Sequence, residues 1–216
     1  MIDLQDPLYE NIHKILSHKN PDNLDMVYDL AISDRNTLED LLEGITSVDE
    51  TLRYNCFKVL LAISEKVPLK LYTEWNTFFE MLQSHNAYHQ MIGVKILANL
   101  TLVDNKDKFE DIAEEFFALL NGKSLVTARY VASGAGVIAQ AKPHLREFIT
   151  KKLLTIDKTA HKNKDLIVFD AIESFESFFG ESENREHIIS FVKKYLKSPS
   201  PKTAKKAGEF MKKHAA

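Results

Sequence analysis

The amino-acid sequence predicts an all-α protein, and more specifically an α-solenoid of about six antiparallel helix hairpins. A sequence block that recurs at a fixed spacing is the first observation behind this fold class. Residues 41–47 (LLEGITS) return as residues 78–84 (FFEMLQS), an offset of 37, and again as residues 116–122 (FFALLNG), an offset of 38. Residues 56–60 (CFKVL) return as GVKIL, also 37 positions later. Such a period is typical of solenoids, in which each unit buries its apolar face only against its neighbours.

The second observation is that helix start signals follow one another with short gaps along the whole chain. Asp6-Pro7 opens the first helix, because proline has no N–H and the first helical turn leaves that group unbonded in any case. Asn20-Pro21 opens the second helix. Asp34 or Asn36 starts the third, which apolar residues at helical spacing predict. Ser47 and Glu50 form a capping-box pattern that starts the fourth helix.

Similar signals predict the eight remaining helices. The starts expected, in order, are Val67-Pro68, Ser84, the segment 104–107, Ser124, Pro143, the segment 161–165, Asn184 and Ser200-Pro201. Gly180 is expected to end the tenth helix, because glycine tolerates the left-handed backbone of that position. The eleventh helix is expected to reach Lys197. The helices pair into hairpins over approximately residues 6–33, 34–65, 68–102, 106–140, 143–180 and 184–214, in a single domain over residues 1–216.

The repeated block also predicts which side chains form the core. Leu42, Phe79 and Phe117 occupy equivalent positions in the three copies. We therefore expect each of them to be buried between neighbouring hairpins.

The hairpin spacing and the repeated block resemble those of the HEAT and armadillo superfamily of helical-repeat proteins. The resemblance covers roughly residues 34–180 and extends more loosely to the ends. It implies a curved stack of hairpins whose second helices line a concave face. It implies no particular activity, because such scaffolds serve many unrelated roles.

Composition sets limits on the environment of the chain. Of the 216 residues, 44% are hydrophobic and 27% are charged, as in ordinary folded proteins. The N-terminus has neither a basic leader nor an apolar run, and no stretch approaches the roughly 18 apolar residues that a membrane span needs. Cys56 is the only cysteine, so neither an intrachain disulfide nor a multi-cysteine zinc site is expected. These features predict a cytoplasmic protein with no membrane partner and leave the oligomeric state open.

Charge is distributed unevenly along the chain. Residues 1–120 contain 10 Lys and Arg against 21 Asp and Glu, a formal charge of −11, whereas residues 121–216 contain 18 against 10, a charge of +8. Such a split can indicate different partners at the two ends, or simply solvated helix faces. The sequence leaves both interpretations open.

Three motifs suggest chemistry but are better explained by structure. His85 and His89 have the spacing of two ligands on one helical face, but a zinc site needs further ligands that the sequence does not place nearby. Gly134-Ala135-Gly136 lies inside an apolar helical run, so close helix packing explains it better than a phosphate loop. Cys56 occupies the position of Gly93 in the next repeat, which indicates a small buried residue. We therefore predict no catalytic residue, no metal site and no cofactor.

Two groups of residues remain as candidates for binding. An element that combines polar and aromatic side chains recurs early in the second helices, and such residue types are favoured at interfaces. Its members are Arg53, Tyr54, Tyr88, His89, Arg129 and Tyr130. A basic C-terminal segment could contact phosphates or form the polar face of a terminal helix. Its lysines are Lys193, Lys194, Lys197, Lys202, Lys205, Lys206, Lys212 and Lys213.

The sequence thus favours a non-enzymatic scaffold that binds a protein or peptide on its concave face. The alternative is a nucleic-acid-binding or nucleic-acid-processing protein similar to the HEAT-like alkylpurine DNA glycosylases. Those enzymes resemble this chain in size and helical-repeat build, and as a family they hold DNA with a basic concave face. The strongly acidic N-terminal half and the single tryptophan, Trp75, argue against transferring the activity of those enzymes to this chain. A bilin-lyase-like repeat protein is a third possibility, but no residue pattern indicates a chromophore site.

Overall fold

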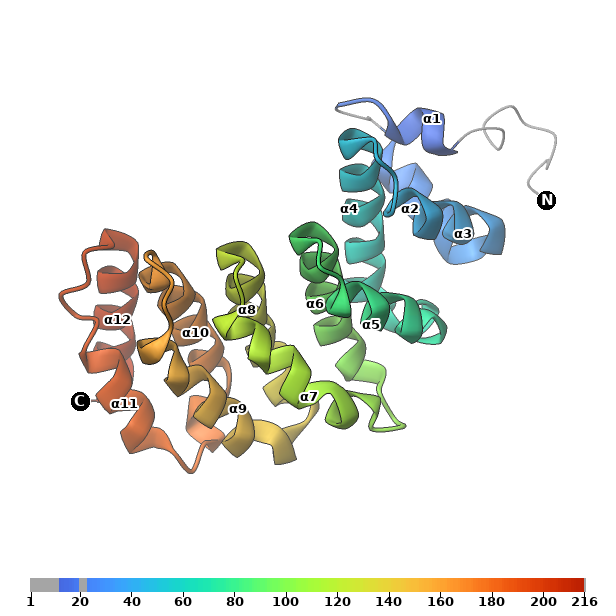
Figure 1. The fold of residues 1–216 in the computed structure, drawn as a ribbon. Coiled ribbons are helices and arrows are strands. Elements are labelled where there is room, and N and C mark those ends of the chain that lie inside the picture. Colours follow the sequence, from blue (N-terminus) through green and yellow to red (C-terminus); the bar gives the residue numbers. More distant parts are fainter. Residues whose placement is uncertain (1–11, 20–22, 216) are drawn as a thin grey trace. The chain divides into compact units, whose positions relative to one another are not determined.

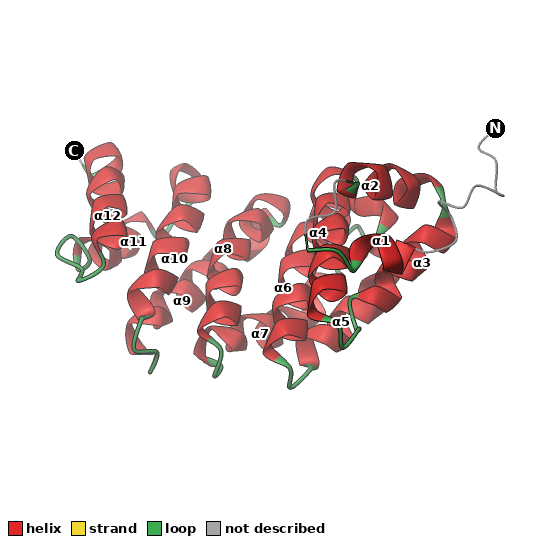
Figure 2. Cartoon of the chain, turned by 90° about the horizontal axis from the view of Figure 1, so that it is seen from above, coloured by secondary structure: helices red, strands yellow, loops and turns green. Residues whose placement is uncertain are grey.

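The computed structural model describes residues 12–19 and 23–215, and every regular element in these ranges is helical (Figures 1 and 2). The α-helices are α1 (Ile12–Leu16), α2 (Leu24–Ser33), α3 (Arg35–Gly44), α4 (Glu50–Lys66), α5 (Trp75–Gln83), α6 (Ala87–Leu100), α7 (Lys108–Ala118), α8 (Leu125–Ala141), α9 (Arg146–Leu154), α10 (Lys164–Phe178), α11 (Arg185–Lys193) and α12 (Pro201–His214). Short 3-10 turns join several of them. In the described ranges no helix is both long enough and apolar enough to cross a membrane.

The chain divides into two compact units, Met1–Glu74 and Trp75–Ala216. The division falls inside the third predicted hairpin, residues 68–102. A single domain over residues 1–216 therefore stays a prediction.

The first unit contains α1 to α4, whose packing includes hydrogen bonds from the buried Asn55 and a tight contact at Gly44. The side-chain amide of Asn55, buried in α4, donates to the carbonyl oxygens of Leu16 at 2.7 Å and His18 at 2.9 Å. It thereby satisfies acceptors that the end of α1 leaves free. Gly44 at the end of α3 lies against Cys56 of α4, where a Cβ on the glycine would come within 2.3 Å of the thiol sulfur.

The second unit has two layers of helices (Figures 1 and 2). One layer contains α6, α8, α10 and α12, each packed against the next in this order. The other contains α5, α7, α9 and α11. Its members are linked by contacts such as the edge-to-face pair of Phe117 in α7 with Phe148 in α9, whose ring centroids lie 5.7 Å apart. Helices that are adjacent in the chain therefore alternate between the two layers.

The repeated block is visible in the core as a recurring set of three side chains. Each set follows the i, i+3, i+7 spacing of one helix face. The sets are Leu38, Leu41 and Ile45; Trp75, Phe78 and Leu82; and Ala113, Phe116 and Leu120, all buried. The offsets between the sets are the 37 and 38 residues found in the sequence.

The predicted core column was wrong by one position. Leu42 and Phe79 are only half-buried, whereas Leu41, Phe78 and Phe116 are completely inaccessible, each with 0% exposure. Phe117 is buried as predicted. Two adjacent apolar residues differ by about 100° around a helix, so a pair such as Phe78-Phe79 cannot place both side chains at the centre of one face.

The caps of α4 and α6 repeat as well, although these two are not the serines that the sequence suggested. Asp49 caps α4, because its carboxylate accepts from the backbone N–H of Thr51 at 2.8 Å, and Asn86 caps α6 in the same way. Ser47 and Ser84 each lie two residues earlier and accept the N–H of the capping residue at 3.1 Å. The capping box of Ser47 and Glu50 was therefore wrong. Where two residues that can cap a helix lie two positions apart, the sequence alone does not determine which of them starts the helix.

Other helix limits also differ from the prediction. Two 3-10 turns, at Pro68–Lys70 and Tyr72–Glu74, precede α5, which begins at Trp75 rather than at Pro68. Helix α11 ends at Lys193 instead of Lys197. Gly180 lies in a 3-10 turn, and no described glycine has a left-handed backbone. The predicted openings at Asp6-Pro7 and Asn20-Pro21 lie outside the described residues. The starts at Ser124 and Ser200-Pro201 are confirmed.

Gly134 and Gly136 let α8 approach a neighbouring helix on each side, as the sequence predicted. A Cβ on Gly134 would lie 2.9 Å from the Cβ of Ala98 in α6. One on Gly136 would lie 2.9 Å from the Oγ of Ser177 and 3.1 Å from the Cα of Ser174 in α10. The hydroxyl of Ser174 also accepts the N–H of Gly136 at 3.1 Å and donates to the carbonyl of Ala132 at 2.5 Å.

We predict that Gly136→Ala lowers the free energy of unfolding by about 1–3 kcal/mol, because the new methyl group overpacks the contact with α10. Gly208→Ala is the matched control. Gly208 lies within α12, where a Cβ would meet nothing within 4 Å, so alanine should stabilise the protein by about 0.4–1 kcal/mol. Urea denaturation measures both changes. Equal effects at the two sites would show that Gly136 does not lie at a tight helix contact.

We also predict that Phe78→Ala costs about 3–5 kcal/mol, the usual range for a core aromatic residue. Phe79→Ala should cost clearly less, because the Phe79 side chain is only half-buried. Thermal unfolding of the two variants provides the comparison. A larger loss for Phe79 would contradict the register of the core described above.

Candidate functional site

A cavity of about 260 Å³ opens on the second unit between α8 and α10. It is lined by Val126, Arg129, Tyr130, Ser133 and Asp170. The first four lie at helical spacing on one exposed face of α8. Because helix spacing brings positions i, i+3, i+4 and i+7 together, these side chains form a single surface stripe.

An ion pair across the two helices forms the inner part of the cavity. The Nε of Arg129 donates to one carboxylate oxygen of Asp170 at 2.7 Å, and Nη2 donates to the other at 3.1 Å. This two-point geometry is the strongest form of the Arg–carboxylate contact. Burial raises the pKa of Asp170, and the hydrogen bonds and charge of Arg129 only partly offset that effect.

The two members of the pair differ in exposure. The Asp170 side chain is 9% exposed, whereas that of Arg129 is 37% exposed. The guanidinium is therefore the solvent-exposed part of the ion pair, and the carboxylate is the buried part.

Two residues of α10 near Asp170, Ser174 and Phe169, contact the neighbouring helices. Ser174 is one helical turn beyond Asp170, and its contact with Gly136 holds α10 close to α8 at that point. On the other side, the ammonium group of Lys202 in α12 lies 3.6 Å from the ring centroid of Phe169, within the range of a cation–π contact. Neither the Gly136–Ser174 contact nor the Lys202–Phe169 pair lines the cavity itself, but both involve residues of α10 close in sequence to Asp170.

The structure brings two of the six predicted partner-binding residues to this cavity, Arg129 and Tyr130. Tyr88 and His89 are half-buried in the first turn of α6. Arg53 and Tyr54 belong to the first unit. There the Nη1 of Arg53 donates to the carbonyl of Ser47 at 2.6 Å, and the exposed ring of Tyr54 carries the ammonium group of Lys58 at 4.9 Å.

Sequence reasoning missed the other three lining residues, Val126, Ser133 and Asp170. Asp170 had a signal that could have been used. It is a charged residue inside the apolar run 167–172 (IVFDAI), and a carboxylate in such a setting needs a buried cationic partner.

The basic C-terminal lysines do not form one uniform cationic surface. Lys206 lies 2.9 Å from Glu176, which also binds Lys213 at 2.9 Å, and Lys194 pairs with Asp157. Lys205 lies 3.9 Å from Glu209. The pKa of Glu176 is lowered by its hydrogen bonds with Lys213 and Lys206. Several positive charges of this segment are therefore compensated by carboxylates of the same unit.

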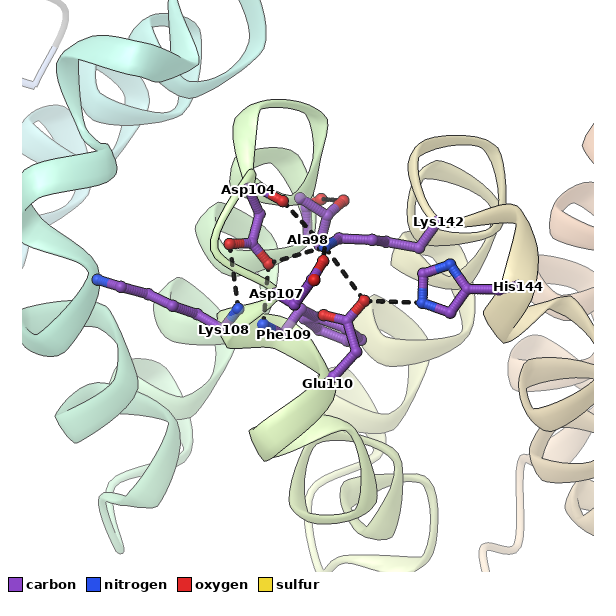
Figure 3. Close-up of polar contacts among 9 residues, drawn as sticks. Ala98, Asp104, Asp107, Lys108, Phe109, Glu110, Lys142 and His144 are labelled. Carbon is purple, nitrogen blue, oxygen red and sulfur yellow. Dashed lines mark hydrogen bonds and ion pairs between the residues drawn. The ribbon is translucent and has the colours of Figure 1, made fainter.

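A second polar cluster lies at the junction of α7, α8 and α9 (Figure 3). Lys142, directly after α8, places its ammonium group 2.7 Å from Asp107, 3.1 Å from Glu110 and 3.2 Å from Asp104. The ring of His144 reaches the same Glu110 oxygen at 2.8 Å. Burial works to lower the pKa of Lys142, but the hydrogen bonds with the three carboxylates outweigh it, so that pKa lies above its usual 10.5.

This cluster holds the loop before α7 in place. The buried carboxylate of Asp104 accepts from the backbone N–H of Lys108 at 3.1 Å and of Phe109 at 2.9 Å. It thereby bonds to the first turn of α7 although Asp104 lies several residues before the helix. Asp107 has a left-handed backbone with φ 53°, the only positive φ of a non-glycine residue in the part of the chain described. The ammonium group of Lys142 donates to the carboxylate of this residue at 2.7 Å. The arrangement explains structure rather than chemistry.

The motifs set aside in the sequence have structural explanations. The expectation that His85 and His89 share a helical face was wrong, because His85 precedes α6 and Asn86 caps that helix. Cys56 is completely buried, and burial raises the pKa of its thiol to about 12. Over the ranges 12–19 and 23–215, no three His, Cys, Asp or Glu side chains are grouped as metal ligands would be.

Comparisons with known proteins add information on the fold only. No family model matches the sequence, and the search of curated proteins found no match. Among solved structures, the chain is similar to the crystal structure of an engineered protein from the Northeast Structural Genomics Consortium. The two chains are 15% identical with a TM-score of 0.52, over 95% of this chain and 96% of the other. At this identity the likeness concerns the fold alone.

We predict that Lys142→Met lowers the free energy of unfolding by about 3–5 kcal/mol, because it leaves the buried carboxylate of Asp104 without its cation. The control is Lys151→Met. That lysine pairs with Glu147 at the surface, and its loss should cost less than about 1 kcal/mol.

The pH dependence of this effect has a defined sign. The pKa of Lys142 is raised in the folded state, so its contribution is complete below the ordinary pKa of 10.5 and is lost only above it. The stability difference between the wild type and Lys142→Met should therefore be constant through neutral and mildly alkaline pH. A difference that vanishes before pH 10.5 would contradict the assignment.

Proposed function

We propose that this chain is a non-enzymatic helical-repeat scaffold of the HEAT/armadillo type that binds a protein or peptide partner in the cytoplasm. The partner lies along the exposed face of the second helices, the concave face of an α-solenoid. The ordered packing of α6, α8, α10 and α12 in the second unit supports the repeat build. So does the recurrence of core side chains and helix caps at offsets of 37 and 38 residues.

One observation carries the binding role. The cavity between α8 and α10 is lined by Arg129 and Tyr130, the residue types that dominate the energetics of interfaces, and it lies on the layer of second helices. Its walls belong to packed helices, so little ordering of side chains or backbone is needed on association.

The nucleic-acid alternative has less support. Contacts with several phosphates require a set of available cations. Lys194, Lys205 and Lys206 each lie within 4 Å of a carboxylate of the same unit. Lys202 is placed over the ring of Phe169.

Substitution of one exposed apolar residue tests the proposal. Val126 at the cavity is 54% exposed, and Leu102, which does not line the cavity, is 52% exposed. We predict that Val126→Glu weakens capture of the native protein partner at least about tenfold, whereas Leu102→Glu leaves it unchanged. Affinity capture from the native cell followed by mass spectrometry identifies the partner, and titration of the purified pair measures its affinity. Equal binding by both variants would exclude the α8–α10 face as the binding surface.

A further inference from the structure

We propose that the cavity between α8 and α10 binds an uncharged stretch of peptide backbone that carries an apolar side chain. In this arrangement Arg129 donates hydrogen bonds to a peptide carbonyl, and the apolar side chain packs on Val126 and Tyr130. The inference rests on the proposed function and specifies the chemistry of its ligand.

The donors of the cavity outnumber its available acceptors. A guanidinium has five N–H groups, and two of them bind Asp170. Three N–H groups of the more exposed partner remain. The hydroxyl groups of Tyr130 and Ser133 add two further groups that donate or accept. A ligand that supplies acceptors therefore fits this set better than one that supplies donors.

The charge of the cavity favours a neutral acceptor. Arg129 and Asp170 are the charged residues among those lining it, and they compensate each other. A cationic ligand would find the carboxylate almost covered and already bonded at both oxygens. An anionic ligand would find a guanidinium whose charge is neutralised at close range. A peptide carbonyl is a strong acceptor without net charge, so it avoids both penalties.

The size and walls of the cavity indicate a portion of a chain rather than a whole small molecule. Its volume of about 260 Å³ lies below the roughly 300–1,000 Å³ of pockets that enclose complete ligands. Val126 provides an exposed apolar surface beside the ring of Tyr130. One side chain and one or two peptide groups match this combination of apolar wall and polar floor.

Fragment titration tests the chemistry directly on the full chain. The probe is N-acetyl-leucine N-methylamide, which contains two peptide carbonyls and an apolar side chain. N-acetyl-leucine supplies a carboxylate instead, and N-acetyl-lysine N-methylamide supplies a cation. NMR would follow the methyl groups of Val126 and the Nε–H of Arg129. We expect the neutral leucine probe to bind with a Kd on the order of 1 mM and the other two at least about tenfold more weakly.

Salt provides a second measurement. The affinity of the neutral probe should be unchanged between about 0.01 and 0.15 M salt, because no net charge is attracted. Tighter binding of the carboxylate or of the cation, with an affinity that falls over this range, would overturn the proposal. Absence of shifts at Val126 up to about 20 mM of the neutral probe would also overturn it.

A double variant separates hydrogen bonding from folding. Arg129→Met combined with Asp170→Leu removes the ion pair without leaving an unpaired buried charge, so the fold should be retained. We expect this variant to lose at least about tenfold in affinity for the neutral probe. Gln140→Ala, on the same exposed face of α8 but outside the cavity lining, should bind like the wild type. Unchanged binding by the double variant would show that Arg129 donates nothing to the ligand.

These outcomes are distinguishable from a failure of the proposed function. If the neutral probe binds but Val126→Glu retains the native partner, the cavity chemistry stands and the scaffold role of this face fails. If Val126→Glu loses the partner and no probe binds, the face is an interface and the backbone-recognition proposal fails.

Discussion

The contact between α8 and α10 at Gly136 is the constraint on which the candidate site depends. Because Gly136 has no side chain, the Cα of Ser174 approaches the α8 backbone closely and the Ser174 hydroxyl bonds to it. Asp170 lies one helical turn before Ser174 and therefore meets the same helix at Arg129. The Arg129 side chain spans the space that remains there between the helices. A larger residue at position 136 would move both ends of the ion pair, so the shape of the cavity depends on a residue that does not line it.

The Lys142 cluster performs a different task at the junction of α7, α8 and α9. Loops between packed helices bury backbone groups that no regular element satisfies. Here one carboxylate, that of Asp104, bonds two N–H groups of α7, and Lys142 balances the charge this brings into the interior. The left-handed backbone of Asp107 is the local strain that accompanies this arrangement. The unit thus uses apolar packing along the helices and charge compensation at a turn.

Much of the fold could be predicted from the sequence, because repetition averages out local uncertainty. The all-helical class and the role of Gly134 and Gly136 are confirmed by the structure, and buried side chains recur at the 37- and 38-residue offsets found in the sequence. The predictions that were wrong concern local details, namely the rotation of a helix and the residue that caps one. The choice between Phe78 and Phe79 depends on a rotation of about 100° that the pattern alone does not determine. The choice between Ser84 and Asn86 as a cap depends on competition between two nearby acceptors.

The candidate site was less accessible to sequence reasoning. Arg129 and Tyr130 stood out by residue type, but their partner Asp170 is 41 positions away in another repeat. Pairing between repeats depends on the rotation of each helix and on the separation of the helix axes. Neither the rotation nor the separation can be derived from residue spacing. The carboxylate of Asp170 inside an apolar run did, however, indicate that a buried cationic partner existed.

The glycine contacts of the first two repeated hairpins have a consequence for recombining the parts of this protein. In α3 and α4 the missing side chain belongs to the first helix, where Gly44 accommodates Cys56. In α5 and α6 it belongs to the second helix, where Gly93 lies against the backbone of Phe78 and Leu82. Exchanging only α4 for α6 would therefore bring two glycines together and leave a void. The reverse exchange would press the side chain of Cys56 onto the α5 backbone, where Gly93 now leaves room. The whole hairpin, rather than the single helix, is the module that can be exchanged or duplicated.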